Sequence, residues 1–181
     1  MKVQFDSRSF LVGVFIFLTA ASTVIFVVEA RGYSLLYDSM SRVQFTLPRG
    51  YLQSPASNGA SIIMEVKGDN PIDYGGLYVT EFVLLIYFTS SNSSLFRDNP
   101  LEKVSAINQA IAPHGLTLWN LTISLGLQDA MSITSFNNAY GGNVSANAFV
   151  QLVVTSNLLQ AIGSFGKYPA TGNLTLIRDP R

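Results

Sequence analysis

The chain has 181 residues, of which 48% are hydrophobic and only 12% are charged, and its 11 basic and 11 acidic residues cancel to zero net charge. This length fits one domain with a small appendage. The charges are scattered without a block, which argues against a nucleic-acid partner. The absence of cysteine excludes disulfides and thiolate metal sites, and the single histidine, His114, excludes a multi-histidine metal site within one chain.

The first element in chain order is an uncharged apolar stretch, residues 10–28 (FLVGVFIFLTAASTVIFVV). At about 1.5 Å of helical rise per residue it nearly matches the thickness of a bilayer's hydrocarbon core, and it has no polar stripe. We predict a transmembrane signal-anchor helix at 10–28 that contacts the lipid bilayer, after a cytoplasmic N-terminus at 1–9 and before a helix-compatible stalk at 29–41. Two alternatives are a signal peptide cleaved near Ala30 or Ala21 and a buried core helix.

The charges that flank this stretch favour export of the rest of the chain. Lys2 and Arg8 precede it, whereas Arg31 and Arg42 after it are offset by acidic residues. Positive residues favour the cytoplasmic side of a membrane helix. We therefore expect a single-pass protein of the cell membrane, with residues 42–181 outside the cell as one domain.

Alternation of apolar and polar residues predicts several β-strands in this domain. The apolar phases expected to face inward are Val43, Phe45 and Leu47; Ala60, Ile62, Met64 and Val66; Trp119, Leu121, Ile123 and Leu125; and Ala146, Ala148, Val150, Leu152 and Val154. Pro48-Arg49-Gly50 is expected to end the first strand, and Leu174 and Leu176 to mark a last short one. Residues 77–88 are apolar in both phases, which predicts a strand that is central or covered on both sides.

Helical signals are few. One short helix is predicted by apolar spacing at i, i+3, i+4 and i+7, namely Leu127, Ala130, Met131 and Thr134. Residues 99–111 are ambiguous, because Asn99-Pro100 followed by Glu102 is typical of a helix start but the segment is short. Several strands separated by Gly, Pro and Asn, with little helix, predict an all-β fold, an antiparallel β-sandwich or barrel.

An acidic segment containing Asn-Pro lies between two predicted strands. Asp69, Asn70 and Asp73, with Glu65 or Glu81 nearby in the sequence, are weak candidates for a calcium site because calcium prefers carboxylate and carbonyl oxygens. Their spacing matches no EF-hand. The favoured interpretation is a bend, in which Asp and Asn bond local backbone N–H groups and proline stops ladder pairing.

No catalytic constellation is evident. His114 lies between Pro113 and Gly115 and is most simply an exposed turn residue, and Gly75-Gly76 and Gly141-Gly142 are hairpin signals rather than phosphate loops. Hydrolase, nucleotide-binding and zinc-protease motifs do not occur. We expect a protein that is not an enzyme, with no cofactor and no small-molecule substrate.

Four Asn-X-Ser/Thr sequons are glycosylation candidates: Asn92, Asn120, Asn143 and Asn173. The last three lie on the polar phase of their strands or strand extensions, where a glycan is compatible with a folded sheet. The alternative is that all four are simply solvent-facing asparagines. A glycoprotein surface of low charge suits a cell envelope in contact with an acidic medium, because few carboxylates would have to be protonated.

Four segments in this order, IIMEVKGDNPIDYGGLYVTEFVLLIYF, IAPHGLTLWNLTISL, NVSANAFVQLVVTS and GNLTL, carry a family resemblance. Over about residues 42–177 the chain resembles the water stress and hypersensitive response (WHy) domain of group 2 late-embryogenesis-abundant (LEA) proteins. Asn70-Pro71 match the family's knuckle, and Pro113 and Gly115 match its short turn. The chain departs from the pattern at Asp69, at Ile72-Asp73, where a second Asn is often found, and in its long connection from Asn92 to Leu101.

The resemblance implies a fibronectin-III-like or immunoglobulin-like β-sandwich, often membrane-anchored, with a protective or binding role and no catalytic residue. We therefore expect an extracellular protein with a non-catalytic binding, protective or structural role at the cell envelope. One alternative is an accessory subunit of a membrane complex, with other membrane or envelope proteins as partners. Another is a surface-filament or surface-layer subunit that assembles by strand addition.

Overall fold

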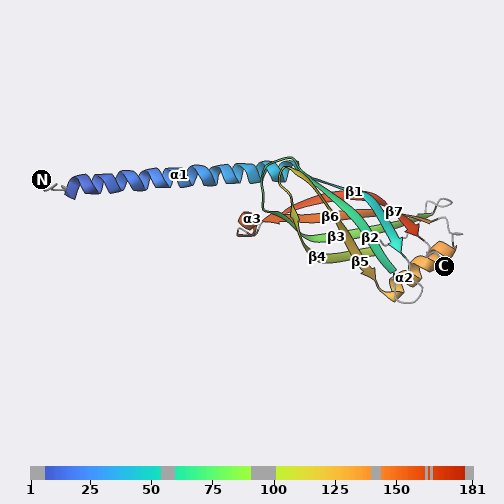
Figure 1. Cartoon of the computed structure of the whole chain (residues 1–181). Coiled ribbons are helices and arrows are strands. Elements are labelled where there is room, and N and C mark those ends of the chain that lie inside the picture. Colours follow the sequence, from blue (N-terminus) through green and yellow to red (C-terminus); the bar gives the residue numbers. More distant parts are fainter. Residues whose placement is uncertain are drawn as a thin grey trace.

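A computed structural model describes residues 7–53, 60–90, 101–139, 144–161, 163 and 165–177 of the chain. In Figure 1 a long N-terminal helix leads into a β-domain, with a second helix at the far end of that domain. The elements in chain order are α1 (Ser7–Arg42), β1 (Gln44–Gln53), β2 (Ala60–Asn70), β3 (Leu77–Ser90), β4 (Leu101–Ile111), β5 (Gly115–Leu125), α2 (Leu127–Ala139), β6 (Val144–Ser156), α3 (Asn157–Ala161) and β7 (Gly166–Ile177).

Helix α1 is a single helix of 36 residues. The stretch expected as a stalk, 29–41, continues the apolar helix without a break, and α1 ends at Arg42. The helix is long and apolar enough to cross a membrane, and none of its most apolar stretch is buried inside the described part of the chain. The interpretation as a core helix is therefore wrong for this structure, because a core helix would be covered by the domain.

The seven described strands are hydrogen-bonded in the order β4-β3-β6-β7-β1-β2-β5, and all neighbours except β1 and β7 pair antiparallel. They make up two sheets. One sheet holds β4, β3 and β6, the other holds β1, β2 and β5, and β7 connects them. Strand β7 pairs antiparallel with β6 from Gly166 to Leu174 and then pairs parallel with β1 through Thr175–Ile177. It is longer than the short last strand expected around Leu174 and Leu176. The coarse prediction of a sandwich-like, mostly β domain is confirmed.

The inward phases predicted from alternation are correct in β2, β5 and β6. Buried side chains include Ile62, Met64, Val66, Leu121, Val150 and Leu152. In β3 the inward phase changes partway, from Leu77 and Val79 to Phe82 and Leu84, because a register shift separates Val79 from Glu81. Strand β3 lies between β4 and β6, as its apolar character predicts, and its second phase is half-buried.

Two segments rich in Gly or Pro, predicted to end a strand and to form a hairpin, do neither in the structure. Pro48-Arg49-Gly50 does not end β1, because the strand continues to Gln53 after a register shift between Thr46 and Arg49. Gly75-Gly76 does not form a hairpin, since β2 and β3 lie in different sheets and do not pair with each other. The two glycines instead allow the chain to change sheets, and Gly76 has a φ of 94°.

Of the two segments with helical signals, one is a strand and the other is a helix in the structure. Residues 101–111 form strand β4, which pairs antiparallel with β3; Asn99-Pro100 lie outside the described residues. Helix α2 is confirmed, but only part of its predicted apolar face is inward, because Leu127 and Met131 are 59% and 63% exposed while Ala130 and Ile133 are buried. Asp129, which pairs with Lys103 of β4 at 2.8 Å, lies on the same side of the helix as the buried Ile133.

Candidate functional site

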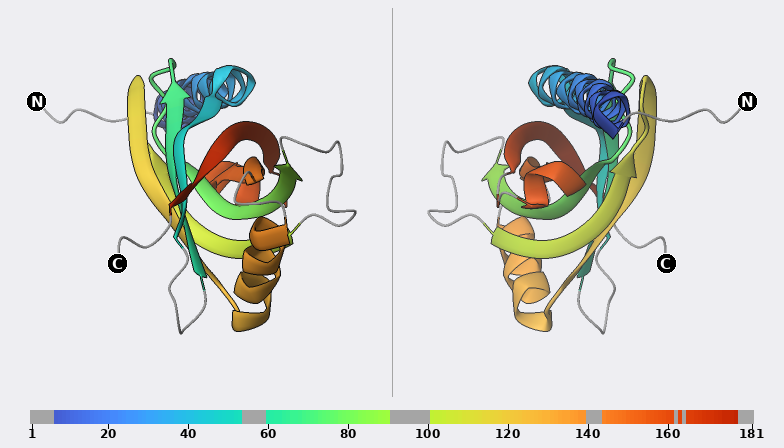
Figure 2. Two further views of the ribbon diagram at one scale, coloured as in Figure 1. Left: turned by 90° about the vertical axis from the view of Figure 1, so that its right-hand side faces the viewer. Right: turned by 90° about the vertical axis from the view of Figure 1, so that its left-hand side faces the viewer.

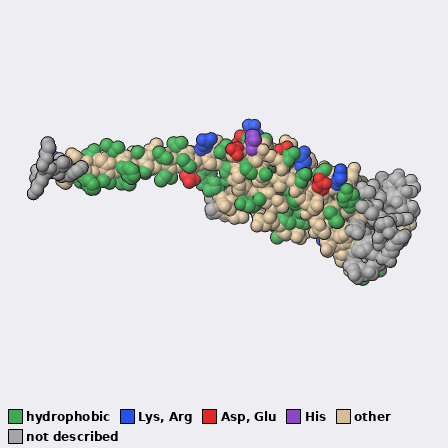
Figure 3. Space-filling view, in the orientation of Figure 1, with side chains coloured by type: hydrophobic (Ala, Val, Ile, Leu, Met, Phe, Trp, Pro, Cys, Tyr) green, Lys and Arg blue, Asp and Glu red, His purple; other side chains and the backbone are tan. Residues whose placement is uncertain are grey.

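The last turns of α1 are built into the β-domain. Leu36 is 4% exposed and Ser39 is fully buried. The Val43 N–H donates to the Ser39 carbonyl at 2.8 Å, and β1 begins at the next residue. The helix therefore passes into the sheet without a flexible linker. Charged side chains, with the single histidine, gather near this junction on the face shown in Figure 3.

Ser39 is joined to the Asn-Pro knuckle by a buried hydrogen bond. Its hydroxyl donates to Oδ1 of Asn70 at 3.0 Å. The same oxygen accepts the Ile72 N–H at 3.2 Å, and Nδ2 of Asn70 donates to the Tyr74 carbonyl at 3.2 Å. Leaving a buried amide without partners would cost about 1–3 kcal/mol. Asn70 thus holds both its own bend and the end of α1.

The knuckle is also bonded to the turn between β4 and β5. The Ile72 carbonyl accepts the N–H groups of Tyr74 and His114, both at 2.9 Å. In the register of β2 with β5, Asn70 lies opposite Gly115. His114 is exposed in this turn and has a φ of 49°. The Asn-Pro and Pro-His-Gly segments, which are far apart in the sequence, therefore form one corner of the domain.

The three calcium candidates lie in different environments. Asp69 and Asp73 are exposed, whereas Asn70 is buried and its Oδ1 already accepts two hydrogen bonds. Within the described part of the chain, no three His, Cys, Asp or Glu residues gather into a group that could hold a metal ion. The bond from the Ile72 N–H to Asn70 is the local side-chain contact that the bend interpretation expects.

A second contact between α1 and the domain comes from the last strand. The Tyr168 hydroxyl donates to the Met40 carbonyl and lies 3.6 Å from Met40 Sδ. Burial raises the pKa of Tyr168 above its usual value. The rings of Tyr168 and Phe45 meet edge to face with centroids 5.6 Å apart, and the rings of Phe45 and Trp119 do so at 6.2 Å. A row of aromatic rings therefore continues from the helix junction into the core.

Sequence reasoning did not find the partners on α1. A sequence signal for this contact exists, because Leu36, Met40 and Val43 lie at i, i+4 and i+7. Apolar residues at this spacing indicate a helix face that packs against another element. Tyr168 lay in a segment with no predicted strand. A single polar contact such as Ser39 with Asn70 leaves no periodic pattern.

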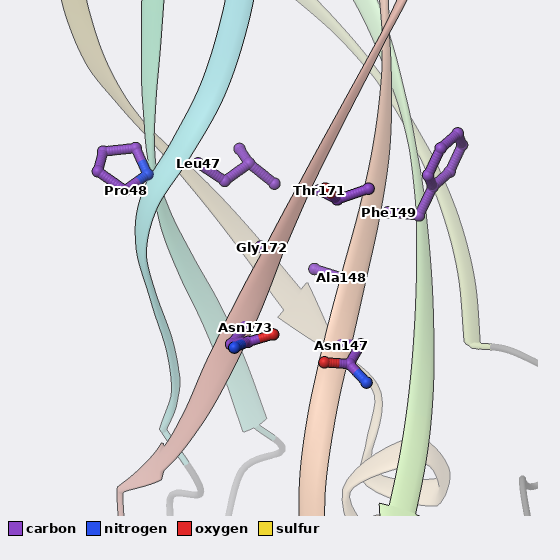
Figure 4. Close-up of a pocket in the computed structure, with 8 residues that line it drawn as sticks. All are labelled: Leu47, Pro48, Asn147, Ala148, Phe149, Thr171, Gly172 and Asn173. Atoms are coloured by element: carbon purple, nitrogen blue, oxygen red, sulfur yellow. The ribbon is translucent and has the colours of Figure 1, made fainter.

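A groove of about 550 Å³ opens beside the irregular part of β1. Pro48 has no N–H to donate, and the described pairing between β1 and β7 covers only Tyr51–Gln53 with Thr175–Ile177. In Figure 4 Asn147 and Asn173 lie side by side on β6 and β7, and Leu47 points toward Gly172. The amide side chains can donate and accept hydrogen bonds, which makes this groove polar and uncharged.

A second groove, of about 450 Å³, lies over β3, β6 and β7 near α3. Its lining includes Glu81, Val153, Phe165 and Lys167. Glu81 lies opposite Val153, and Val153 lies opposite Lys167, so the two charged residues flank Val153 on neighbouring strands. The Lys167 ammonium lies 5.7 Å from the centroid of the Phe165 ring. This groove therefore combines an acidic side chain, a basic side chain and an aromatic ring.

The glycosylation candidates are divided between described and undescribed parts of the chain. Asn120 on β5 and Asn173 on β7 have exposed side chains, as expected from their phase. Asn92 and Asn143 lie outside the described residues.

Comparison with known proteins found solved structures at low sequence identity only. No protein-family model and no curated protein matches the chain. Similar solved structures include a protein from Archaeoglobus fulgidus (8% identity, TM-score 0.47, 72% of this chain and 96% of that one) and one from Arabidopsis thaliana (9%, 0.45, 76% and 84%). A further similar structure is described as a late embryogenesis abundant protein (8% identity, TM-score 0.43, 86% of this chain and 83% of that one).

Proposed function

We propose that this chain is a membrane-anchored protein with a non-catalytic binding, protective or structural role at the outer face of the cell. The observation that carries the proposal is α1, an apolar helix whose outer part is uncovered and whose inner end is locked into the β-domain. The hydroxyls of Thr19 and Thr23 donate to carbonyls four residues earlier, at 2.9 and 2.8 Å. Such internal bonds suit a helix in lipid, where no water satisfies polar groups.

We further propose that the domain belongs with the WHy domains and has their fibronectin-III-like or immunoglobulin-like form. The two motifs that carry the resemblance, Asn70-Pro71 and Pro113 with Gly115, meet at one corner through the bond from the His114 N–H to the Ile72 carbonyl. The two short motifs, which are far apart in the sequence, are thus in contact in the folded domain. A protective or binding role follows from the resemblance and requires no reacting group.

Protease accessibility in intact cells tests this proposal. The chain is expressed with one tag before residue 1 and another after residue 181. Protease added outside should remove the C-terminal tag and leave the N-terminal tag, and both tags should stay with the membrane fraction in alkaline carbonate. A C-terminal tag that survives protease would contradict display outside the cell. Loss of the N-terminal tag from the mature chain would show a cleaved signal peptide.

A second candidate function, an accessory subunit of a membrane complex, is favoured by the outer face of the sheet that contains β3. Val83, Leu85 and Phe149 are only half-buried there, and Val104 is 57% exposed. An apolar surface of this kind is typical of a protein contact. Purification in mild detergent separates the two functions, since a stable stoichiometric complex favours the subunit and a monodisperse monomer favours the independent protein.

A further inference from the structure

One end of the β-domain faces back along α1, toward the part of the helix assigned to the bilayer. We call it the α3 end; it consists of α3, Phe165 and the first residues of β7. In Figure 1 α3 lies at the level of the last turns of α1, and in the right view of Figure 2 it lies near the middle of this end, with α1 at the upper edge. A Cβ on Gly166 would lie only 2.6 Å from Met40 Cε, so β7 starts directly against the helix.

The length of α1 places this end close to the membrane surface, if α1 spans the bilayer as proposed above. The apolar stretch ends at Val28, and Leu36 is the first helix residue buried by the domain. The helical rise between them is about 12 Å. Headgroups extend about 5 to 7 Å beyond the hydrocarbon core on each side. The α3 end reaches back over part of this distance, and a helix tilt of about 20° toward the α3 end would lower it further.

The two contacts between α1 and the domain make this placement rigid. Ser39 is bonded to Asn70, and the Met40 carbonyl accepts the Tyr168 hydroxyl. Because α1 is one helix up to these contacts, the domain cannot swing away from the membrane without breaking these two hydrogen bonds, the first of which is buried. The α3 end is therefore held at the headgroup layer rather than at the end of a flexible tether.

The exposed side chains at this level suit a membrane interface. Tyr33 on α1 and Phe165 are both 54% exposed. Aromatic residues are enriched where hydrocarbon meets headgroups. Phe165 adjoins the groove that Glu81 and Lys167 flank, with Val153 between them in register. One acid and one base about two strand spacings apart, roughly 10 Å, match a headgroup that carries both a phosphate and an ammonium group.

We propose that the α3 end rests on zwitterionic phospholipid headgroups of the bilayer that α1 spans. Phe165 enters the headgroup layer, Lys167 pairs with lipid phosphate, and Glu81 pairs with the lipid ammonium group. This contact rests on the proposed membrane anchoring, and it defines how the domain is oriented on the surface.

Single-cysteine labelling tests the contact in the full chain, because the sequence has no cysteine of its own. A fluorescent label is placed by Gln160→Cys on α3, by Met131→Cys on α2 at the far end, or by Phe17→Cys in the apolar stretch. Each labelled chain is reconstituted into phosphatidylcholine nanodiscs that contain nitroxide lipids. Headgroup nitroxide should quench the label at position 160 and leave the label at 131 bright, and acyl-chain nitroxide should quench the label at 17.

The outcomes separate this inference from the proposed anchoring. An unquenched label at 17 would overturn the anchoring itself. Quenching at 17, with position 160 no more quenched than 131, would overturn the headgroup contact and leave the anchoring intact. Adding Phe165→Ser should reduce quenching at 160, whereas the matched change Leu127→Ser, at a 59% exposed residue of the far end, should not. Equal quenching in discs of uncharged galactolipid would overturn the roles given to Glu81 and Lys167.

Discussion

Ser39, near the end of α1, donates its hydroxyl proton to the side-chain oxygen of Asn70, at the end of β2, across 3.0 Å in the buried interior. This bond joins the proposed anchor to the corner of the sandwich where β2 passes into the other sheet. The same asparagine oxygen shapes the turn by accepting the Ile72 N–H. The orientation of the domain on its helix and the course of the chain between the sheets therefore depend on one side chain.

Asn70→Ala should destabilise the domain. The change leaves the Ser39 hydroxyl, the Ile72 N–H and the Tyr74 carbonyl without their partner, and we expect the free energy of unfolding to fall by about 2–4 kcal/mol. Urea unfolding in detergent, followed by the fluorescence of the single tryptophan, Trp119, measures this change. Asp69→Ala, at the exposed neighbouring residue, is the control and should cost less than about 0.5 kcal/mol. Equal losses in both variants would argue against the buried bonds as the cause.

Gly172→Ala should be costly although alanine is the smallest substitution. A Cβ at this position would lie 2.8 Å from the Leu47 Cβ and 3.0 Å from the Leu47 carbonyl oxygen, so β1 and β7 must move apart. We expect a loss of about 1–3 kcal/mol in the free energy of unfolding. Gly75→Ala is the matched control, because a Cβ added at Gly75 would meet no atom within 4 Å. A melting temperature that falls equally for both glycines would refute the close approach of the strands.

The inward face of α2 can be tested with two substitutions. Ile133→Ala removes a side chain that is 6% exposed and should cost about 2–4 kcal/mol, whereas Met131→Ala changes one that is 63% exposed and should be nearly neutral. Chemical unfolding of the two variants in parallel gives the comparison. The reverse order of stabilities would restore the face that sequence spacing predicts.

The stability of the chain should depend on Tyr168 at alkaline pH. Burial raises the pKa of this hydroxyl in the folded chain above the usual 10.0. Below about pH 10 the group is protonated in both the folded and the unfolded state, so its contribution is complete. As the pH rises further, the unfolded chain loses the proton first, and the free energy of unfolding declines until the folded-state pKa is passed.

Tyr168→Phe should flatten this alkaline decline. At neutral pH it should also lower the free energy of unfolding by about 1 kcal/mol, because the Met40 carbonyl loses its donor. Urea unfolding between pH 7 and roughly pH 11 measures both effects. Tyr37→Phe, at a residue that is 78% exposed, is the control and should leave the pH profile unchanged. An identical alkaline decline in Tyr168→Phe would assign the effect to other groups.

Features that depend on hydrophobicity repeated along a short stretch could be predicted from the amino-acid sequence alone. The apolar run 10–28 requires a long helix without a polar stripe, and strict alternation places Met64 and Val150 inward, because each depends only on neighbours in the chain and on the exclusion of apolar surface from water. The corner at Asn70-Pro71 was recognisable for the same reason, since Pro and Asn act on their own backbone.

Which elements meet, and which side of an ambiguous element is covered, depends on long-range packing and could not be predicted from local sequence. Met131 and Ile133 are both apolar residues of α2, and the packing of α2 against the sheets, with Asp129 paired to Lys103, left Met131 in solvent. The register shift between Val79 and Glu81 changed the inward phase of β3, and such a shift depends on the partner strands β4 and β6. The bond between Ser39 and Asn70 joins residues 31 positions apart. A single long-range polar contact leaves no periodic pattern in the sequence, so it can be identified only in the folded structure.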